Sequence, residues 1–570
     1  MGKIKVKEAI APEISKHIYP ENELVAHLLF HRGVRDSESA RDFLDPDFTK
    51  HTYNPFLFKG MKEAVARIRK AVESKEMVAV WADYDADGIP GAVVFHDFLK
   101  KIGHTNFFVY IPDRHHEGFG LNHDGIDECR EKGATLIITI DCGITDVADI
   151  DYAKGLGVEV IVTDHHEPHD ILPVAVAIID HKQPGCDYPF KELCGAATIW
   201  KVVCAYLSLY RDTHNVVEGW EKWLLDMVGI STLSDMVPLV GENRVLAHYG
   251  LQVLRKSPRP GLRALCAETG VDQRNLNETD IGFSITPRIN AASRMGVPMD
   301  AFTLLSATTD TEAITLAKRL EKINKERKSA VAVLSKEARK RLTARENDSV
   351  IVLGDTSWRP ALLGLVANSL ASEFKKPAFL WGLDGDGVIK GSCRSGGGKS
   401  VLEIMKGVKE GSFIAYGGHK ASGGFEVSFD AIHTLHEALH ESGLAVSKIK
   451  ETDEPIVDHA LRVHDVNRKT TSLLSKLAPF GVGNTQPLFV FESVTPSMVA
   501  RFGKENNHLK VSFTLDSGNV VDAIAFFVDD LNLKAVPEAG KPMHLIASIE
   551  ESAFRGRKEI RLRIADIISA

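Results

Sequence analysis

The chain has 570 residues, of which 44% are hydrophobic and 26% charged, and this is the composition of an ordinary globular protein with about three or four domains. It contains no apolar run of about 18 residues and no apolar signal core near its start, so we expect a cytoplasmic protein with no membrane partner. Its seven cysteines form no C-x-x-C pair, which argues against a disulfide framework or zinc finger, and its formal net charge of −8 requires that any nucleic-acid surface be local.

The first 310 residues divide into a short helical segment, residues 1–60, and a predicted α/β domain, residues 61–310. In the α/β domain, apolar strand-like runs alternate with helical segments, which is the pattern of a doubly wound parallel sheet. The predicted strands are Val78–Trp81, Phe107–Ile111, Leu136–Ile140, Val158–Val162 and Val174–Ile179.

Three carboxylates follow the first of these strands. Asp83, Asp85 and Asp87 alternate with other residues, Gly88 closes the turn, and a helix with Pro90 in its first turn begins. This is the position at which open α/β sheets bind ligands. Carboxylates so close together repel one another unless a cation lies between them, and hard divalent cations suit such a site. The alternative is an ordinary acidic turn.

Two further strands end in residues of the same kind. Asp141 follows the third strand, and Asp164, His165 and His166 follow the fourth. Since parallel strands bring their carboxyl ends to one edge of the sheet, we expect these groups to meet, and the imidazoles favour Mn²⁺ over Ca²⁺. Asp235 follows a helical segment and is either a further ligand or a helix cap.

Together these stretches resemble the four ordered motifs of the DHH phosphoesterase superfamily. They are D-Y-D-A-D-G at 83–88, I-D-C-G at 140–143, D-H-H at 164–166 and S-D-M-V-P-L at 234–239. The resemblance implies two Mn²⁺ or Mg²⁺ ions. The implied metal ligands are Asp83, Asp85, Asp87, Asp141, His165 and Asp235, and the implied catalytic residues are Asp85, Asp87, Asp141, His165, His166 and Asp235.

Other segments resemble one branch of that superfamily, the RecJ single-strand exonucleases. They are Tyr110–Arg114 with Glu117–Leu121, Leu193–Ala197 and Pro287–Arg294. The resemblance implies that Arg114, Arg288, Asn290 and Arg294 bind substrate. Each segment could instead be a plain loop with a surface arginine.

Residues 311–346 contain neither glycine nor proline and predict one helix of about 54 Å. It carries eleven Lys and Arg against five Asp and Glu. A solvated connector between domains explains this pattern, although a basic helix beside a cleft would also attract a phosphate backbone.

A second α/β domain is predicted at residues 347–450. Two glycine-rich stretches, 391–398 and 416–425, are interpreted as loops whose backbone can approach a phosphate. They resemble the DHH-associated domain, and the implied substrate-binding residues are Ser392, Arg394, Gly417, Gly418, His419 and Ser422. Two features depart from the RecJ pattern: Trp358–Ala361 reads W-R-P-A where W-H-P-G is usual, and position 90 is proline. These two departures leave the detailed contacts with substrate undetermined, but they do not involve the implied metal ligands.

Five short strands between residues 455 and 570 predict a small β-barrel, similar to the OB-folds that bind single strands. A barrel with incidental basic loops is the alternative. The resemblance to the RecJ exonucleases runs over nearly the whole chain, and it implies a 5′→3′ exonuclease on single-stranded DNA in recombination and repair. It would release mononucleotides by two-metal hydrolysis, as a monomer that works with a helicase and a single-strand-binding protein. The alternatives are a DHH phosphodiesterase acting on nano-RNA or cyclic dinucleotides, and a non-catalytic replication scaffold.

Overall fold

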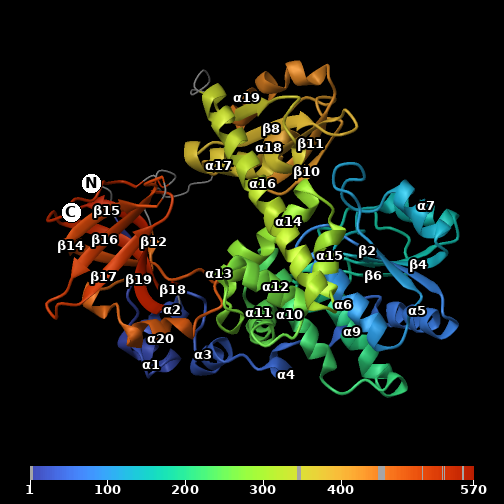
Figure 1. The fold of residues 1–570 in the computed structure, drawn as a ribbon, viewed down its shortest axis with the longest axis horizontal. Coiled ribbons are helices and arrows are strands. Elements are labelled where there is room, and N and C mark those ends of the chain that lie inside the picture. Colours follow the sequence, from blue (N-terminus) through green and yellow to red (C-terminus); the bar gives the residue numbers. More distant parts are fainter. Residues whose placement is uncertain are drawn as a thin grey trace. The chain divides into compact units, whose positions relative to one another are not determined.

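The computed structural model describes residues 4–342, 348–446, 456–503, 505–528, 531, 533–554 and 557–570 (Figure 1). The chain forms two compact units, one made of Met1–Asp47 with Lys450–Ala570 and the other of Phe48–Ile449. Among the described residues, none of the helices combines the length and apolar character needed to cross a bilayer.

A five-stranded sheet forms the centre of the first α/β domain. Its strand order is β3-β2-β4-β5-β6, and every neighbouring pair is parallel. The strands are β2 Met77–Ala82, β3 Phe107–Tyr110, β4 Ala134–Ile140, β5 Glu159–Thr163 and β6 Ala177–Ile179. The predicted doubly wound parallel sheet is confirmed.

Helices cover both faces of this sheet because its side chains alternate between two cores. Val78 and Val80 join one core, while Ala79 and Trp81 join the other. The helices on the first face are α5 Met61–Ser74, α6 Gly88–Lys101 and α9 Gly195–Tyr210, and those on the second are α7 His123–Glu131 and α8 Val147–Gly155.

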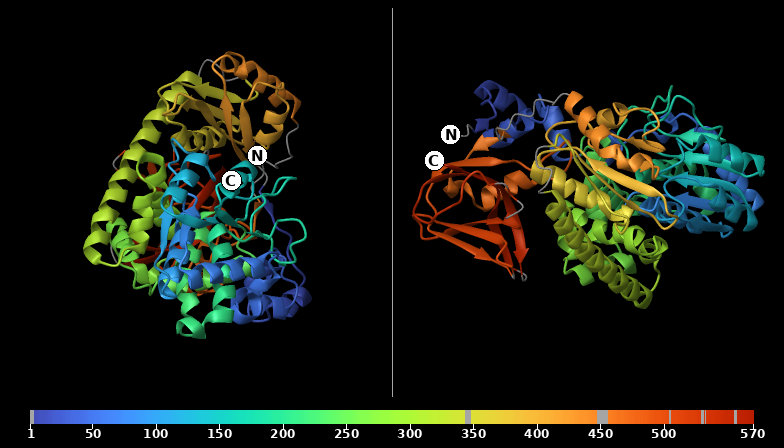
Figure 2. Two further views of the ribbon diagram at one scale, coloured as in Figure 1. Left: turned by 90° about the vertical axis from the view of Figure 1, so that its right-hand side faces the viewer. Right: turned by 90° about the horizontal axis from the view of Figure 1, so that it is seen from above.

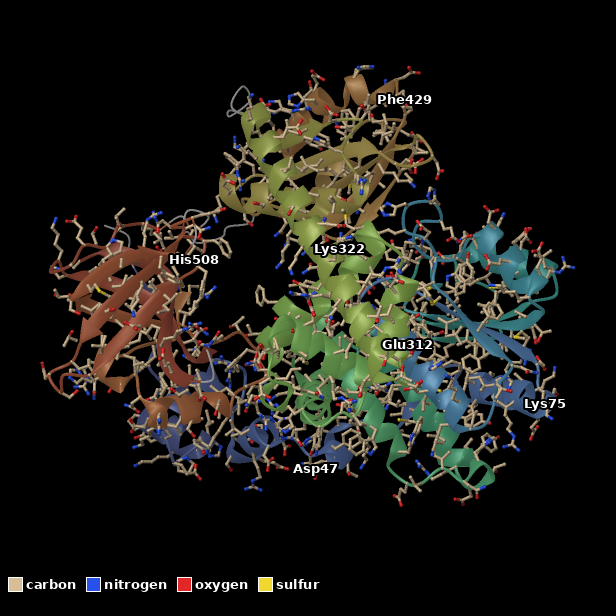
Figure 3. All side chains as sticks on the ribbon, viewed as in Figure 1. Asp47, Lys75, Glu312, Lys322, Phe429 and His508 are labelled. Atoms are coloured by element: carbon tan, nitrogen blue, oxygen red, sulfur yellow. The ribbon has the colours of Figure 1, made fainter. Side chains whose placement is uncertain are left out.

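The long helix α16, Asp310–Leu342, connects the two α/β domains, and Figures 1 and 2 show it as one continuous helix. Figure 3 labels Glu312 and Lys322 on it. Its first half packs with α12 Pro260–Thr269, α14 Thr286–Met295 and α15 Met299–Ser306. Leu334, Ala338 and Leu342 in its second half enter the core of the second domain. The helix therefore runs between the two domains and contributes side chains to the core of each. Residues 343–346 of the prediction lie outside the described residues.

The second α/β domain contains a mixed sheet with the order β10-β11-β9-β8-β7. Its elements are β7 Ile351–Gly354, α17 Pro360–Phe374, β8 Ala378–Leu383, β9 Ile389–Arg394, β10 Ala415–Gly418 and β11 Ser422–Val427. The interpretation of the two glycine-rich stretches as loops is wrong, because most of their residues lie in the paired strands β9, β10 and β11. Glycine serves close packing here: a Cβ on Gly391 would lie 2.1 Å from the ring of Phe425.

The C-terminal region forms a seven-stranded sheet with the order β13-β14-β18-β19-β17-β16-β15, two strands more than expected. The strands are β13 His459–Ala460, β14 Phe489–Val494, β15 Met498–Phe502, β16 His508–Thr514, β17 Val520–Ala525, β18 Met543–Phe554 and β19 Arg557–Ser569. His508, labelled in Figure 3, opens β16.

The helical segment within residues 4–47 shares a hydrophobic core with this sheet. Helices α1 Pro12–Ile18, α2 Glu23–Phe30 and α3 Ser37–Leu44 contribute buried side chains to the core that contains Phe489 and Phe491. The guanidinium of Arg32 donates hydrogen bonds to Asn484 Oδ1 at 2.8 Å and to the Thr485 carbonyl at 2.7 Å. The helical segment expected at residues 1–60 is thus divided between the two units.

This shared core predicts different behaviour for two truncated chains. A chain of residues 48–446 should fold, whereas residues 1–446 should bind a hydrophobic dye and aggregate, because Ile18, Val25, Leu28 and Leu29 lose their cover. Exposing four such side chains costs about 6–12 kcal/mol. Dye fluorescence, size-exclusion chromatography and thermal melting of both chains measure the difference. Identical behaviour of the two chains would show that α1–α3 do not depend on the sheet.

Candidate active site

The site lies at the carboxyl ends of β2, β4 and β5, which are neighbours in the order β2-β4-β5. These ends deliver Asp83 to Asp87, Asp141, and Asp164 to His166, and Asp235 joins them from the end of α10, Leu225–Ser234. The side chains expected from the sequence to form one cluster therefore come together. The reason is that parallel neighbours present their carboxyl ends at the same edge.

Backbone amides hold the loop between β2 and α6. Asp85 Oδ1 accepts from the amides of Asp87 at 2.7 Å and Gly88 at 3.3 Å. The amide of Ala86 donates to Asn290 Oδ1 at 2.9 Å, so Asn290 fixes the loop that carries the carboxylates. A Cβ on Gly88 would lie 2.3 Å from the Asp83 carbonyl oxygen, so the turn requires glycine.

Asp87 is held by the start of helix α9. Its Oδ2 accepts from the Gly195 amide at 2.6 Å, its Oδ1 accepts from the Ala196 amide at 2.8 Å, and the Ser231 hydroxyl also donates to Oδ1. A helix N-terminus stabilises a carboxylate in this way because its first amides lack partners within the helix. A Cβ on Gly195 would lie 2.5 Å from Asp141 Cβ, which explains the glycine.

Asp164 holds the two histidines that follow it in the chain. It is buried, and it accepts from the amides of Ile144 at 3.0 Å, His165 at 2.7 Å and His166 at 3.1 Å. It also bonds His166 Nδ1 at 2.7 Å. Burial acts against ionisation, but these hydrogen bonds and the two imidazoles lower the pKa of Asp164 to about 2. Asp164 is therefore an ionised brace for the histidine pair.

The potential ligand atoms form adjoining groups. His165 Nε2 lies 3.1 Å from Asp141 Oδ1, 3.5 Å from Asp87 Oδ2 and 3.7 Å from Asp235 Oδ2. Three sets each bring their ligand atoms within 4.8 Å of one another. They are Asp87 with His165 and Asp235, Asp83 with Asp85 and Asp141, and Asp141 with His165 and His166. Because Asp141 and His165 are shared between sets, the arrangement suits two neighbouring cations.

Unpartnered atoms test whether cations fit. Asp83 Oδ1, Asp141 Oδ1 and His165 Nε2 are buried and have no hydrogen-bond partner among the described residues. Buried polar atoms without partners are costly, so three of them facing one centre indicate a site built for ligands outside the chain. Carboxylates and imidazole are ligands suited to Mn²⁺, and carboxylates to Mg²⁺.

The electrostatics of the cluster also indicate a cation site. Burial and then repulsion from Asp87 and Asp85 raise the pKa of Asp235 to about 9. Burial and neighbouring carboxylates also raise the pKa of Asp83 and Asp141 well above the usual range. Burial lowers the pKa of His165 to about 4, which leaves its Nε2 neutral and able to bind a cation. Divalent cations would relieve this repulsion and keep the carboxylates ionised.

Three arginines gather beside the carboxylates. Arg294 Nη1 donates to the Ala361 carbonyl of the second domain at 2.7 Å, Arg394 ends β9, and the Arg114 guanidinium lies 4.8 Å from the centre of the Tyr84 ring. Burial, then repulsion from Arg114, lowers the pKa of Arg294 to about 9, and burial with Arg114 nearby lowers that of Arg394. Cations held this close favour an anion between them.

The remaining candidate residues are placed less directly. Arg288 is buried and forms an ion pair with Glu321 at 2.8 Å, which favours a structural role between α14 and α16. Ser422 lies opposite Arg394 in the β11–β9 register, and Gly424 lies opposite Ser392. Gly417, Gly418 and His419 lie on the exposed β10–β11 hairpin.

Sequence reasoning missed several residues of the site. Gly195, Ala196 and Ser231 anchor Asp87, and only the first two lie in a segment that the sequence had marked. The exposed ring of Phe119 meets His166 edge-on at 5.5 Å between ring centres. No pattern distinguishes Ser231 from any other helical serine, so only the structure reveals its contact.

Family models match three parts of the chain. They describe the DHH family N-terminal domain at residues 77–232, the DHHA1 domain at residues 347–442 and the RecJ OB domain at residues 457–566.

Known proteins match nearly the whole chain. The single-stranded-DNA-specific exonuclease RecJ of Bacillus subtilis (strain 168) is 36% identical over 559 residues, which covers 96% of this chain and 68% of that protein. The exonuclease of the same name from Escherichia coli (strain K12) is 29% identical over 532 residues, covering 89% of this chain and 90% of that protein. The crystal structure of RecJ with Mn²⁺ from Thermus thermophilus superimposes with a TM-score of 0.82 at 25% identity, covering 99% of this chain and 79% of that one. The chain therefore belongs to the RecJ family of single-stranded-DNA-specific exonucleases.

Proposed function

We propose that this protein is a single-stranded-DNA exonuclease that degrades from the 5′ end and releases mononucleotides by metal-assisted hydrolysis. The observation that carries this proposal is the pairing of two sites in one unit: a buried Asp and His cluster with unpartnered ligand atoms, and three arginines gathered beside it. The family relatives, named as exonucleases specific for single-stranded DNA, support the substrate.

Asp83, Asp85, Asp87, Asp141, His165 and Asp235 would hold two Mn²⁺ or Mg²⁺ ions, and bound cations supply an activated water and neutralise charge on the scissile phosphate. Other residues of the chain hold the side chains of the site in position. The α9 amides fix Asp87, and Asp164 orients His166. Although burial acts against it, the bond to Asp164 raises the pKa of His166 to about 9, so the protonated ring can donate an N–H hydrogen bond to a phosphate oxygen.

The arginines account for polarity. A 5′-terminal phosphate carries a charge of roughly −2, so it binds bidentate guanidinium groups more strongly than an internal phosphate does. With that end held by Arg114, Arg294 and Arg394, the first phosphodiester would reach the metal ligands. Ser392, Ser422 and the exposed β10–β11 hairpin would support the end of the strand.

Two other functions fit less well. A phosphodiesterase for nano-RNA or cyclic dinucleotides needs no C-terminal nucleic-acid-binding region, whereas residues 457–566 match the RecJ OB domain. A non-catalytic replication scaffold has no need of the complete ligand set that this chain retains.

We further propose that the protein acts in the cytoplasm as a monomer, in recombination and repair, with a helicase and a single-strand-binding protein.

Digestion of oligonucleotides labelled at one end tests the proposal. With Mn²⁺ present, a 5′-labelled single strand should release labelled mononucleotide at once, and a 3′-labelled strand should shorten stepwise from its other end. Resistance of a blunt duplex would show single-strand specificity. Release of 3′ label first would overturn the polarity.

Replacing Asp87 by alanine should abolish hydrolysis. The carboxylate lies 3.5 Å from His165 Nε2 in the ligand cluster, and losing a metal ligand removes several kcal/mol of transition-state stabilisation. Rates are measured on a 5′-phosphorylated oligonucleotide, with Asp151→Ala on the exposed side of α8 as the control. More than about a tenth of wild-type activity in Asp87→Ala would contradict the assignment.

Metal binding should also stabilise the fold, because cations relieve repulsion among Asp83, Asp141 and Asp235. Saturation at about 100 times the dissociation constant adds about 2.7 kcal/mol. The melting temperature of chelator-treated protein should therefore rise when Mn²⁺ is added, and Asp235→Asn should reduce that rise. Equal rises in both proteins would place the cations elsewhere.

Arg394→Ala should raise KM more for 5′-phosphorylated than for 5′-hydroxyl oligonucleotides. Only the phosphorylated end offers the doubly charged group that a bidentate arginine prefers. Wild type and variant are compared on both substrates as a double-difference cycle in kcat/KM. Arg341→Ala, which changes an arginine bonded to Glu337 and Asp355, is the control. An equal loss of kcat/KM on the 5′-phosphorylated and 5′-hydroxyl substrates would show that Arg394 contacts the nucleic-acid backbone without reading the terminal phosphate.

A further inference from the structure

The turn after β6 is held by buried polar side chains that the proposed chemistry does not use. Asp180 is fully buried, and its Oδ1 accepts from the amide of Lys182 at 2.6 Å. Gln183, also buried, donates from Nε2 to the Ile178 carbonyl at 2.6 Å. Buried polar groups on both sides of one lysine fix the backbone from which that lysine projects.

The side chain of Lys182 reaches the loop that follows β5 and carries His165 and His166. Its Nζ lies 3.2 Å from Oε1 of Glu167, the residue that follows His166. The Lys182 side chain is 22% exposed, whereas that of Glu167 is 67% exposed. An ion pair with so exposed a partner contributes little to stability, so this pair by itself does not explain why buried polar groups fix the backbone at Lys182.

Positive charge therefore flanks the cluster on both sides. Arg114 interacts with Asp83 and Asp85 and partly offsets the rise that burial causes in their pKa values. Lys182 has the same effect on Asp235, whose pKa burial raises. Arg114 follows β3 and Lys182 follows β6, the two outermost strands of the sheet. Four strand spacings separate those edges, about 19 Å, and the metal ligands lie between them.

A strand bound across this edge of the sheet would contact these charges in order. If the arginines hold the 5′-terminal phosphate and the metal ligands hold the first phosphodiester, the following phosphodiester extends away from the arginines, toward the β6 edge. We propose that Lys182 binds this phosphate, the first one on the 3′ side of the scissile bond. The inference rests on the proposed function and defines a further subsite of the same site.

Short substrates isolate this contact. A 5′-phosphorylated dinucleotide contains the terminal and scissile phosphates only, a trinucleotide adds the phosphate in question, and a trinucleotide with an uncharged methylphosphonate at that linkage removes its charge. Lys182→Ala should raise KM for the trinucleotide about five- to tenfold, as expected for losing a charge-assisted contact. It should change kcat little, and its effect on the other two substrates should be several-fold smaller.

Two further variants sharpen the test. Lys182→Arg keeps the charge and should restore most of the trinucleotide KM, while Glu167→Gln removes the competing carboxylate and should lower that KM. Lys154→Ala, an exposed lysine on α8, is the matched control and should behave as wild type.

The outcomes separate the inference from the function on which it rests. An equal effect of Lys182→Ala on the trinucleotide and its methylphosphonate analogue, or a loss confined to kcat, would overturn the subsite. Should the wild type leave the dinucleotide uncut, the two trinucleotides still decide the question. Wild-type protein that cuts no 5′-phosphorylated substrate, or cuts from the 3′ end, would instead overturn the proposed function and the subsite with it.

Discussion

Repulsion among buried carboxylates is the constraint on which the rest of the structure depends. Asp83, Asp85, Asp87, Asp141 and Asp235 converge where water is largely excluded, and burial with mutual repulsion raises the pKa of several of them. The fold opposes that repulsion with fixed donors. The α9 amides and Ser231 hold Asp87, while the turn amides hold Asp85. What these donors leave unsatisfied faces one centre, and cations complete the site.

The second α/β domain supplies what the first lacks. The Asp and His cluster belongs to the first domain, but Arg394 belongs to the second, and Arg294 of the first domain donates to the Ala361 carbonyl of the second. The helix α16 contributes to the cores of both domains, so it sets the spacing between the ligand cluster and Arg394. A packed helix is a stiff spacer because each of its turns is hydrogen-bonded to the next. The relative positions of the ligand cluster and Arg394 therefore depend on the packing of this helix.

Glycine has a different role here from the one its pattern indicates. Paired glycines at 391–398 and 416–425 predict anion-binding loops, yet most of these residues lie in strands β9, β10 and β11. Gly391 makes room for the ring of Phe425, and a Cβ on Gly364 would lie 2.8 Å from Arg394 Nη2. The departure at Ala361 does not change the contact made there, because Arg294 donates to the backbone carbonyl of Ala361, which any residue supplies.

The sequence by itself determined the parallel sheet, the long helix and the cluster of Asp and His side chains at the edge of that sheet. These follow from local pattern: apolar runs of strand length, a helical repeat without glycine or proline, and acidic or imidazole residues directly after strands. Only the tertiary structure decided that helices α1–α3 share a core with the C-terminal sheet, that Arg288 pairs with Glu321, and that Lys182 pairs with Glu167. These facts depend on contacts between residues far apart in the chain, and hydrophobic or charged patterns give the type of a residue's partner without its identity.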